Sequence, residues 1–330
     1  MKRRFAATQR SLEPRGTAFL AGKYNLTGKE KGALDETVSL GRSLSRIGLI
    51  CGVLAMAVVM LVMPLGSVAA ETVESVVEVL PAAFTDVPRG EHFPIFNYLG
   101  GLRILSGDRG LGGPVRPQEP LTRVEFTAVM IRLAGKQDVA RSFMNGVPEF
   151  TDGPDIPRWA WGMVTTARDM GLIRGYPDGT FRPYNTVTQG EALTMLARLL
   201  EWEPAQWGDW DGYVGRAVQG GLAGRLRLDL IEEAPAYKHE VAHMAYMALE
   251  ASPDDSTETL FDRQFTSVRG VFGSYDLSEG TAILGGRQYD LAARVVLAAG
   301  NSLGDLTGHP VSAVLDSEGR ILFLNPLVGP

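Results

Sequence analysis

The apolar positions of the chain follow a helical spacing in three separate segments. Each segment starts at a glutamate, and in each the apolar side chains occupy positions i, i+3, i+4 and i+7, which places them on one face of a helix. The three sets are Phe126, Val129, Met130 and Leu133 after Glu125; Ala192, Met195, Leu196 and Leu199 after Glu191; and Val241, Met244, Ala245 and Ala248 after Glu240. The shared register predicts three related helices with buried stripes.

Shorter motifs recur at a constant offset of 66 residues. FTD occurs at 84–86 and 150–152, and Arg-Pro occurs at 116–117 and 182–183. TRVEF at 122–126 corresponds to TQGEA at 188–192. Each copy also carries an aromatic-containing apolar segment that ends in glycine, and WDGYVGRAVQGGLAG precedes the third helix. The pattern predicts three helix–loop–helix units. Units this small cannot bury their apolar stripes alone, so we expect them to share one core.

The helix starts contain residues with two different explanations. Thr122 with Glu125, and Thr188 with Glu191, have the spacing of capping boxes. Tyr237 replaces the threonine in the third copy, which should cost that helix ~1 kcal/mol of cap. Capping does not explain Arg123, because a cation at the first helical position opposes the helix dipole. It is either a solvated bystander or a ligand-binding residue.

The last part of the chain changes its period. After a polar linker at 252–259, residues 260–330 read as short strands separated by glycine or Asp-Ser-Glu-Gly turns. They predict a small all-β, barrel-like module. We find no nucleophile–base pair, metal cluster or phosphate loop in its sequence, so its role is not predicted.

The first 70 residues have the pattern of an export signal. Residues 1–46 contain ten Lys/Arg and four Asp/Glu, residues 47–63 are an apolar run of 17, and PLGSVAA follows. We interpret 1–70 as a signal peptide with a long basic n-region, cleaved after Ala70, and 71–82 as a short lead-in segment. An uncleaved membrane anchor is the alternative, since 17 residues lie at the lower limit of a spanning helix.

Removal of that leader changes the charge and the cysteine content. The whole chain has 32 basic and 38 acidic side chains; subtracting ten and four leaves 22 and 34, a net charge of −12. A body this acidic argues against nucleic-acid binding, and an anionic partner would need a local basic pocket. The only cysteine, Cys51, lies in the leader, so the exported part cannot form disulfides.

The combination of FTD, an aromatic helix, GLIRGYPDGTFRP and a T-R-x-E helix start resembles the S-layer homology (SLH) family. The resemblance covers repeat 1 at 83–137, repeat 2 at 148–202 and a degenerate repeat 3 at 203–251. It implies a mainly α pseudo-trimer of helix–loop–helix repeats, exported to the cell wall or cell surface. The implied function is non-covalent anchoring, without enzymatic activity or cofactor. The implied partner is a secondary cell-wall polysaccharide with pyruvate ketals, bound in grooves between repeats; a membrane would be contacted only through an uncleaved leader.

The resemblance also assigns candidate glycan-binding residues. The family's carboxylate-binding arginine corresponds to Arg123 in repeat 1, Gln189 in repeat 2 and Lys238 in repeat 3. We therefore expect one strong and one weaker pocket, unless Arg174 or Arg182 compensates, with free helix N–H groups as further donors. Trp159 stands at the position of the family's helix-one tryptophan, where it would either stack on a sugar or belong to the core.

A competing motif is HEVAH at 239–243, which fits the zinc-metallopeptidase pattern with His239 and His243 as ligands and Glu240 as base. We disfavour it because Glu240 already serves as a helix-start glutamate and no third ligand follows. His243 should face solvent, and His92 and His309 suggest no cluster. A protein–protein scaffold that binds no glycan is the remaining alternative.

Overall fold

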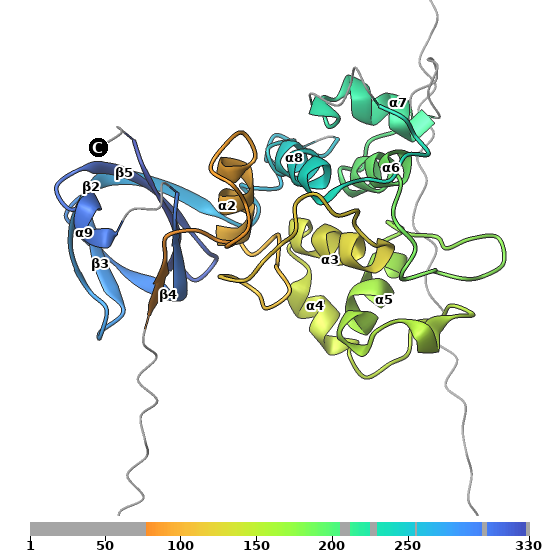
Figure 1. The fold of residues 1–330 in the computed structure, drawn as a ribbon, viewed down its shortest axis with the longest axis horizontal. Helices are drawn as coiled ribbons and strands as arrows, with labels where there is room; N and C mark the ends of the chain where they lie inside the picture. Colours follow the sequence, from red (N-terminus) through yellow and green to blue (C-terminus); the bar gives the residue numbers. More distant parts are fainter. Residues whose placement is uncertain (1–76, 205–211, 225–229, 255, 299–301, 328–330) are drawn as a thin grey trace, which may run out of the picture. The chain divides into compact units, whose positions relative to one another are not determined.

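The computed structural model of the chain describes residues 77–204, 212–224, 230–254, 256–298 and 302–327. The predicted signal peptide at 1–70 lies outside these residues. The described part contains eight α-helices and six β-strands (Figure 1). None of the helices in these ranges is long and apolar enough to cross a membrane.

Each predicted repeat contributes two helices. They are α2 (Phe93–Gly101) and α3 (Arg123–Leu133); α5 (Trp161–Asp169), entered through η2 (Arg158–Ala160), and α6 (Gln189–Leu199); α7 (Gly212–Gln219) and α8 (Lys238–Leu249). All twelve side chains assigned to the three apolar stripes are buried. The three stripe helices predicted from the sequence are therefore confirmed. Two short helical elements, α4 (Gln137–Ser142) and η1 (Gly153–Asp155), connect the first repeat to the second.

The repeats interlock instead of standing side by side. The first helix of each repeat packs against the second helix of the preceding repeat: α5 contacts α3, α7 contacts α6, and α2 contacts α8. The three second helices, α3, α6 and α8, also contact one another pairwise. The repeats thus close into a ring around one shared core, as expected for units too small to bury their own stripes.

A ring of three backbone hydrogen bonds brings the starts of α3, α6 and α8 together. Leu121 N–H donates to Ala236 O at 2.9 Å, Ala236 N–H to Val187 O at 2.9 Å, and Val187 N–H to Leu121 O at 3.0 Å. Each of these residues immediately precedes a helix cap. The ring therefore fixes the three T-R-x-E positions relative to one another, with each helix start facing the neighbouring repeat.

The FTD aspartates hold distant parts of their own repeats. Asp152 accepts hydrogen bonds from the backbone N–H groups of Phe181 and Arg182, both at 2.7 Å. Asp86 binds Arg116 N–H at 2.7 Å in the same way. Arg116 and Arg182 have positive φ angles of 54° and 59°, which are costly for residues with a Cβ. The carboxylates therefore stabilise a strained Arg-Pro segment about 30 residues away, a longer reach than a local turn.

Besides the helical repeats, the structure contains a six-stranded sheet and one short helix, α9 (Leu303–Leu306). Its strands are β1 (Glu78–Leu80), β2 (Thr266–Asp276), β3 (Thr281–Leu284), β4 (Arg287–Leu297), β5 (Pro310–Leu315) and β6 (Ile321–Pro326). The strand order is β1-β4-β3-β2-β5-β6, with an additional parallel β4–β6 pairing.

The C-terminal strands agree with the predicted β module, but two parts of the fold prediction need correction. The sheet is not a clear barrel: β4 pairs with β6 and, over partly the same residues, with the additional strand β1, and the β4–β6 register shifts between Leu291 and Val296. The described fold is also mixed, with substantial helix and sheet, so the mainly α class is not confirmed for the chain as a whole. The helical description fits the repeats alone.

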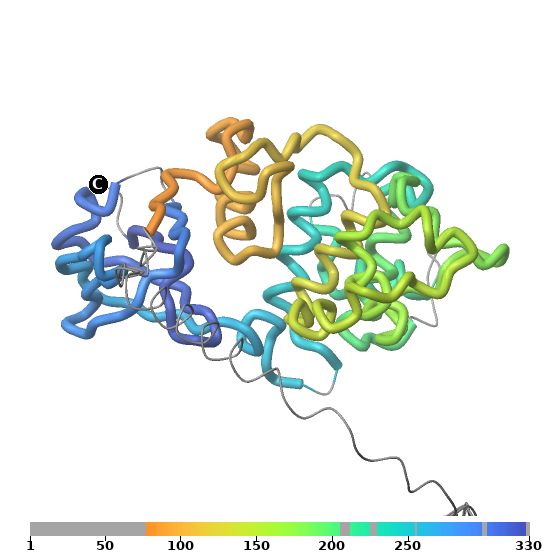
Figure 2. The backbone as a smooth tube through the Cα atoms, turned by 90° about the horizontal axis from the view of Figure 1, so that it is seen from below, coloured from red at the N-terminus to blue at the C-terminus, as the bar shows by residue number. Residues whose placement is uncertain are grey.

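Strand β1 was not predicted. It lies in the lead-in segment and pairs in parallel with β4, with Glu78 opposite Arg294. Figures 1 and 2 show this orange segment against the blue C-terminal strands. Residues that precede the helical repeats in the sequence and residues that follow them therefore form one sheet.

Asn97 on α2 connects the repeats to this sheet. It is buried, its side-chain amide donates to Leu297 O at 2.8 Å and Ala298 O at 3.1 Å, and its oxygen accepts from Ala83 N–H. Nearby, Phe323 of β6 lies so close to Gly101 that a Cβ on Gly101 would approach its ring at 2.7 Å. The β module is thus docked on α2 by close packing and buried hydrogen bonds.

Candidate functional site

The three T-R-x-E positions form a cyclic set of contacts between repeats. Each motif side chain reaches the helix-start glutamate of the next repeat around the ring. The contacts are Arg123 Nη1 to Glu191 Oε1 at 3.3 Å, Gln189 Nε2 to Glu240 Oε1 at 3.2 Å, and Lys238 Nζ to Glu125 Oε1 at 3.9 Å. The structure therefore places all three family-derived positions at repeat boundaries.

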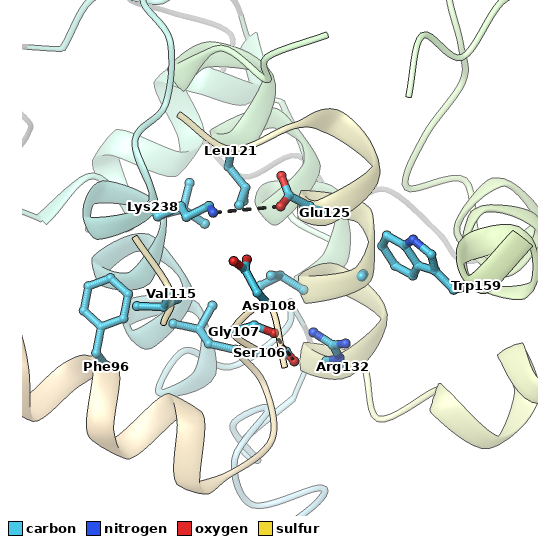
Figure 3. Close-up of a pocket in the computed structure, with 14 residues that line it drawn as sticks. Phe96, Ser106, Gly107, Asp108, Val115, Leu121, Glu125, Arg132, Trp159 and Lys238 are labelled. Carbon is cyan, nitrogen blue, oxygen red and sulfur yellow. Dashed lines mark hydrogen bonds and ion pairs between the residues drawn. The ribbon is translucent and has the colours of Figure 1, made fainter. Parts of the chain in front are cut away.

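Two of these boundaries are hollowed. The first cavity, named here the Arg123 groove, has a volume of about 480 Å³ and is lined by Arg123, Arg174, Glu191, Thr194, Arg198 and Val214, among others. The second, the Lys238 groove, has a volume of about 380 Å³ and is lined by Lys238, Asp108, Glu125, Ala128, Arg132 and Trp159, among others (Figure 3). Glu191, Thr194 and Arg198 are the 66-residue equivalents of Glu125, Ala128 and Arg132, so the two grooves are related by the repeat.

Arg123 is a buried arginine and not a solvated bystander. Only 7% of the residue is exposed. Its guanidinium lies over the rings of Tyr176, at 5.0 Å, and Phe181, at 5.5 Å. Nη1 binds Glu191, whereas Nε is buried and has no hydrogen-bond partner in the structure. The Arg123 groove thus contains an oriented cation with an unused donor.

The expectation that free helix N–H groups add donors at this site is wrong. Arg123 N–H donates to Asn185 O at 2.8 Å and Val124 N–H to Pro183 O at 3.0 Å, while the third amide is used by the capping box. The Arg-Pro segment of the next repeat crosses the helix start and uses these donors. The groove therefore presents side chains, and not these backbone amides, as hydrogen-bond donors.

The capping residues have different geometries in the three repeats. Thr122 with Glu125, and Thr188 with Glu191, form capping boxes at the starts of α3 and α6. At α8 only half of the box is formed, because Tyr237 N–H donates to Glu240 at 2.8 Å but the tyrosine side chain makes no cap hydrogen bond.

The other two motif positions differ from Arg123. The Lys238 side chain is 11% exposed and lies 3.9 Å from both Glu119 and Glu125. Gln189 is buried, and both ends of its amide are used, since Oε1 also accepts from Ile231 N–H at 3.1 Å. Gln189 therefore connects the second repeat to the third and presents no unused donor of the kind seen at Arg123.

Trp159 does not belong to the core. It is 49% exposed and lines the Lys238 groove. In Figure 3 it lies on the other side of α3 from Lys238 and Asp108. The indole is thus available at the groove without contacting the lysine.

Arg182 does not line the Arg123 groove but contacts Tyr176, whose ring lies beside Arg123. Its guanidinium binds Asp178 at 2.7 Å and lies 4.0 Å from the Tyr176 ring, which stands between it and Arg123. The Tyr176 hydroxyl donates to Glu191 at 2.9 Å. Hydrogen bonds from Thr180, followed by Arg182, hold the pKa of Asp178 well below its usual range. Arg182 therefore supports the tyrosine beside Arg123 and is not among the residues that line the groove.

The structure places Arg174 in the Arg123 groove, as the sequence analysis allowed, but sequence reasoning missed one further cation in each groove. Arg132 lines the Lys238 groove and Arg198 the Arg123 groove. Both residues stand ten positions after the cap threonine, in the last turn of their helices. Because Arg132 and Arg198 are separated by the 66-residue repeat offset, the sequence could have indicated that they are equivalent.

The prediction that the histidines form no cluster is also wrong. His92 Nδ1 lies 3.0 Å from His243 Nε2, and the His92 ring is centred 5.0 Å from that of His239. His243 is accordingly partly buried and does not simply face solvent. Within the described ranges, however, no group of three or more His, Cys, Asp or Glu residues is placed to hold a metal ion. The HEVAH motif therefore gains no support as a zinc site.

Comparisons with known proteins point to the same family as the motifs. Residues 149–193 match the family model of the S-layer homology domain. The chain is 33% identical over 106 residues to the Middle cell wall protein of Brevibacillus brevis, covering 31% of this chain and 10% of the relative. It is 30% identical over 121 residues to the Cellulosome-anchoring protein of Acetivibrio thermocellus, covering 35% and 24%. It is 40% identical over 75 residues to Outer membrane protein SlpA of Deinococcus radiodurans, covering 23% and 6%.

Residues 149–193 are thus an S-layer homology repeat, and the interlocked helices place one unit of similar build on either side of it. The chain contains an S-layer homology domain, recognised in its second repeat. It spans less than a quarter of the length of each of these three relatives.

Proposed function

We propose that this protein anchors non-covalently to the cell envelope by binding an anionic secondary cell-wall polysaccharide, with pyruvate ketals as the acidic groups. The observation that carries the proposal is Arg123, a buried arginine in a groove between repeats whose Nε has no partner. The names of the relatives, a cell wall protein and an anchoring protein among them, support attachment to the wall in general. The polysaccharide itself is inferred from the groove and the family resemblance.

The chemistry of the Arg123 groove suits a carboxylate. A buried donor without a partner costs on the order of 1–3 kcal/mol, so stability alone does not explain an arginine at this position. A guanidinium also matches a carboxylate as a planar two-donor fork, and burial strengthens the interaction relative to water. Because the body of the chain carries a net charge of −12 without its leader, such a local site is needed to hold an acidic polymer.

The Lys238 groove provides a second, weaker contact. Lysine is a point charge and cannot replace the bidentate geometry of arginine. The half-exposed Trp159 offers an aromatic face on which a sugar ring can stack. Two grooves on one ring would let a repetitive polymer be held at two points, which raises the apparent affinity without further contacts.

This function implies an exported protein at the cell surface with no catalysis and no cofactor of its own. The names of the relatives, cell wall, anchoring and outer membrane proteins, support a surface location. A membrane would be contacted only through residues 1–70, if that leader is retained.

Sedimentation with purified cell wall tests the proposal. The full chain is mixed with intact wall and with wall from which the secondary polysaccharide has been extracted, and the bound fraction is measured. We expect binding to intact wall, loss of binding to extracted wall, and competition by the soluble extracted polymer. Equal binding to both wall preparations would overturn the proposal.

A further inference from the structure

We infer that each groove uses a second cation to bind the acidic ligand: Arg198 together with Arg123, and Arg132 together with Lys238. This inference rests on the proposed function and adds two binding residues to it. The inference also restricts the ligand: its acidic group must contact both cations of one groove.

The three repeats provide an internal comparison. The groove of repeat 2 receives Arg123 and contains Arg198, and the groove of repeat 1 receives Lys238 and contains Arg132. At the third boundary the motif position is Gln189, and the residue ten positions after the cap is Met247. The two cations are thus present together at two boundaries and absent together at the third, as expected if they act on one ligand.

The geometry of the Arg123 groove supports a joint role. Arg198 Nε, like Arg123 Nε, is buried without a partner, and both side chains line this cavity. The Arg198 guanidinium is held over the Tyr213 ring at 5.0 Å. Burial lowers the pKa of Arg198, and the neighbouring charges of Arg174 and, more weakly, Arg123 lower it further. An anion between these guanidiniums would relieve the repulsion.

The helix dipole alone does not explain the second cation. A cation in the last turn of a helix is favourable, and Arg132 and Arg198 both stand there. Helix α8 has the same dipole, yet it has no basic residue in its last turn. The dipole also leaves the partnerless Nε of Arg198 unexplained. Among the three second helices, the arginine is present where the groove has a motif cation and absent where it has none, although the first helices α5 and α7 also have an arginine in the last turn.

Acidic residues narrow the ligand class. Glu191 occupies Nη1 of Arg123, and Glu232 and Glu233 also line the groove. A uniformly charged polyanion would be repelled by these carboxylates. We therefore infer a saccharide with a single localised carboxylate, which can enter between the guanidiniums while the neutral ring passes the glutamates.

The test compares Arg198→Gln with Arg198→Lys in the full chain by sedimentation with intact wall. Arg216→Gln is the matched control, since Arg216 stacks on Trp202 and pairs with Asp254 away from the groove lining. We expect the glutamine variant to bind about tenfold more weakly and the lysine variant to retain part of the affinity. The midpoint of thermal unfolding is measured for each variant. Amidation of the wall carboxylates should remove the difference between wild type and Arg198→Gln.

The outcomes separate this inference from the proposed function. If wild type binds intact wall and Arg123→Ala weakens it, but Arg198→Gln binds like the control, the second cation is refuted and the anchoring role stands. If both Arg198 variants lose binding in proportion to a lower unfolding midpoint, the residue only supports packing and the inference is again refuted. If the wild-type protein does not bind intact wall, both the proposed anchoring function and the second-cation inference are refuted.

Discussion

Arg123 of the first repeat and Glu191 of the second meet across the repeat boundary at 3.3 Å. The same carboxylate accepts from Thr188 N–H at 3.1 Å and from the Tyr176 hydroxyl at 2.9 Å. One glutamate therefore closes the cap of its own helix and orients the groove cation supplied by its neighbour. A ligand bound at Arg123 would contact two repeats at once, so the proposed site requires correct assembly of the ring.

The FTD aspartates should be important for stability. Asp152→Ala leaves the N–H groups of Phe181 and Arg182 without their acceptor and removes the support of a positive-φ residue. We expect a loss of about 2 kcal/mol in the free energy of unfolding, measured by urea denaturation. The exposed Asp155 is a nearby control, and Asp155→Ala should change stability little. Equal effects of the two variants would contradict the role assigned to Asp152.

Completing the third capping box should stabilise the protein. Tyr237→Thr supplies the missing hydroxyl at the start of α8, where Glu240 is already in place. We expect a gain of about 0.5–1 kcal/mol, visible as a higher midpoint of thermal unfolding. Thr188→Ala, which removes an existing cap, should lower the midpoint by a comparable amount. A lower midpoint for Tyr237→Thr would mean that the tyrosine contributes more by packing.

The contact between α2 and the β module should depend on Asn97. Asn97→Ala leaves the carbonyl groups of Leu297 and Ala298 without their donor in a buried region. We expect the free energy of unfolding to fall by about 2 kcal/mol. Hydrogen exchange should show greater opening at the end of β4, while the exposed Asn185→Ala serves as control. Unchanged exchange at β4 would show that the docking does not rest on this side chain.

An exposed carboxylate at the Arg123 groove should oppose ligand binding. Glu233→Gln removes one negative charge from the lining without touching the contacts of Arg123. We expect binding to intact wall to strengthen by about two- to fivefold at low salt, with the gain lost at high salt because the charge is exposed. Glu203→Gln, an exposed change outside the groove lining, provides the comparison. No difference between the two variants would show that Glu233 does not face the ligand.

The sequence predicted the parts of the fold that follow from local periodicity. The stripes around Phe126, Ala192 and Val241 predicted three buried helix faces, because a repeated register constrains both the type and the orientation of an element. Strand β1 was missed since three residues carry no detectable alternation and their partner, around Arg294, is more than 200 positions away. The parallel β4–β6 pairing and its register shift join distant segments, so the sequence pattern does not show them.

The candidate site was predicted less completely than the fold. The family resemblance located Arg123, Gln189 and Lys238, but their contacts with glutamates of other repeats depend on how the ring closes. For the same reason the contact between His92 and His243 was not predicted. Arg198 could have been found from its 66-residue equivalence with Arg132, although only the structure shows that its Nε lacks a partner.

The most direct test of the central claim compares Arg123→Ala with Gln189→Ala by sedimentation with intact wall, under conditions where both variants are folded. The two residues occupy equivalent positions and are similarly buried, but of the two only Arg123 is charged and lines the Arg123 groove. The account predicts that Arg123→Ala weakens binding about tenfold or more while Gln189→Ala stays close to wild type. Equal losses, or a greater loss for Gln189→Ala, would contradict it.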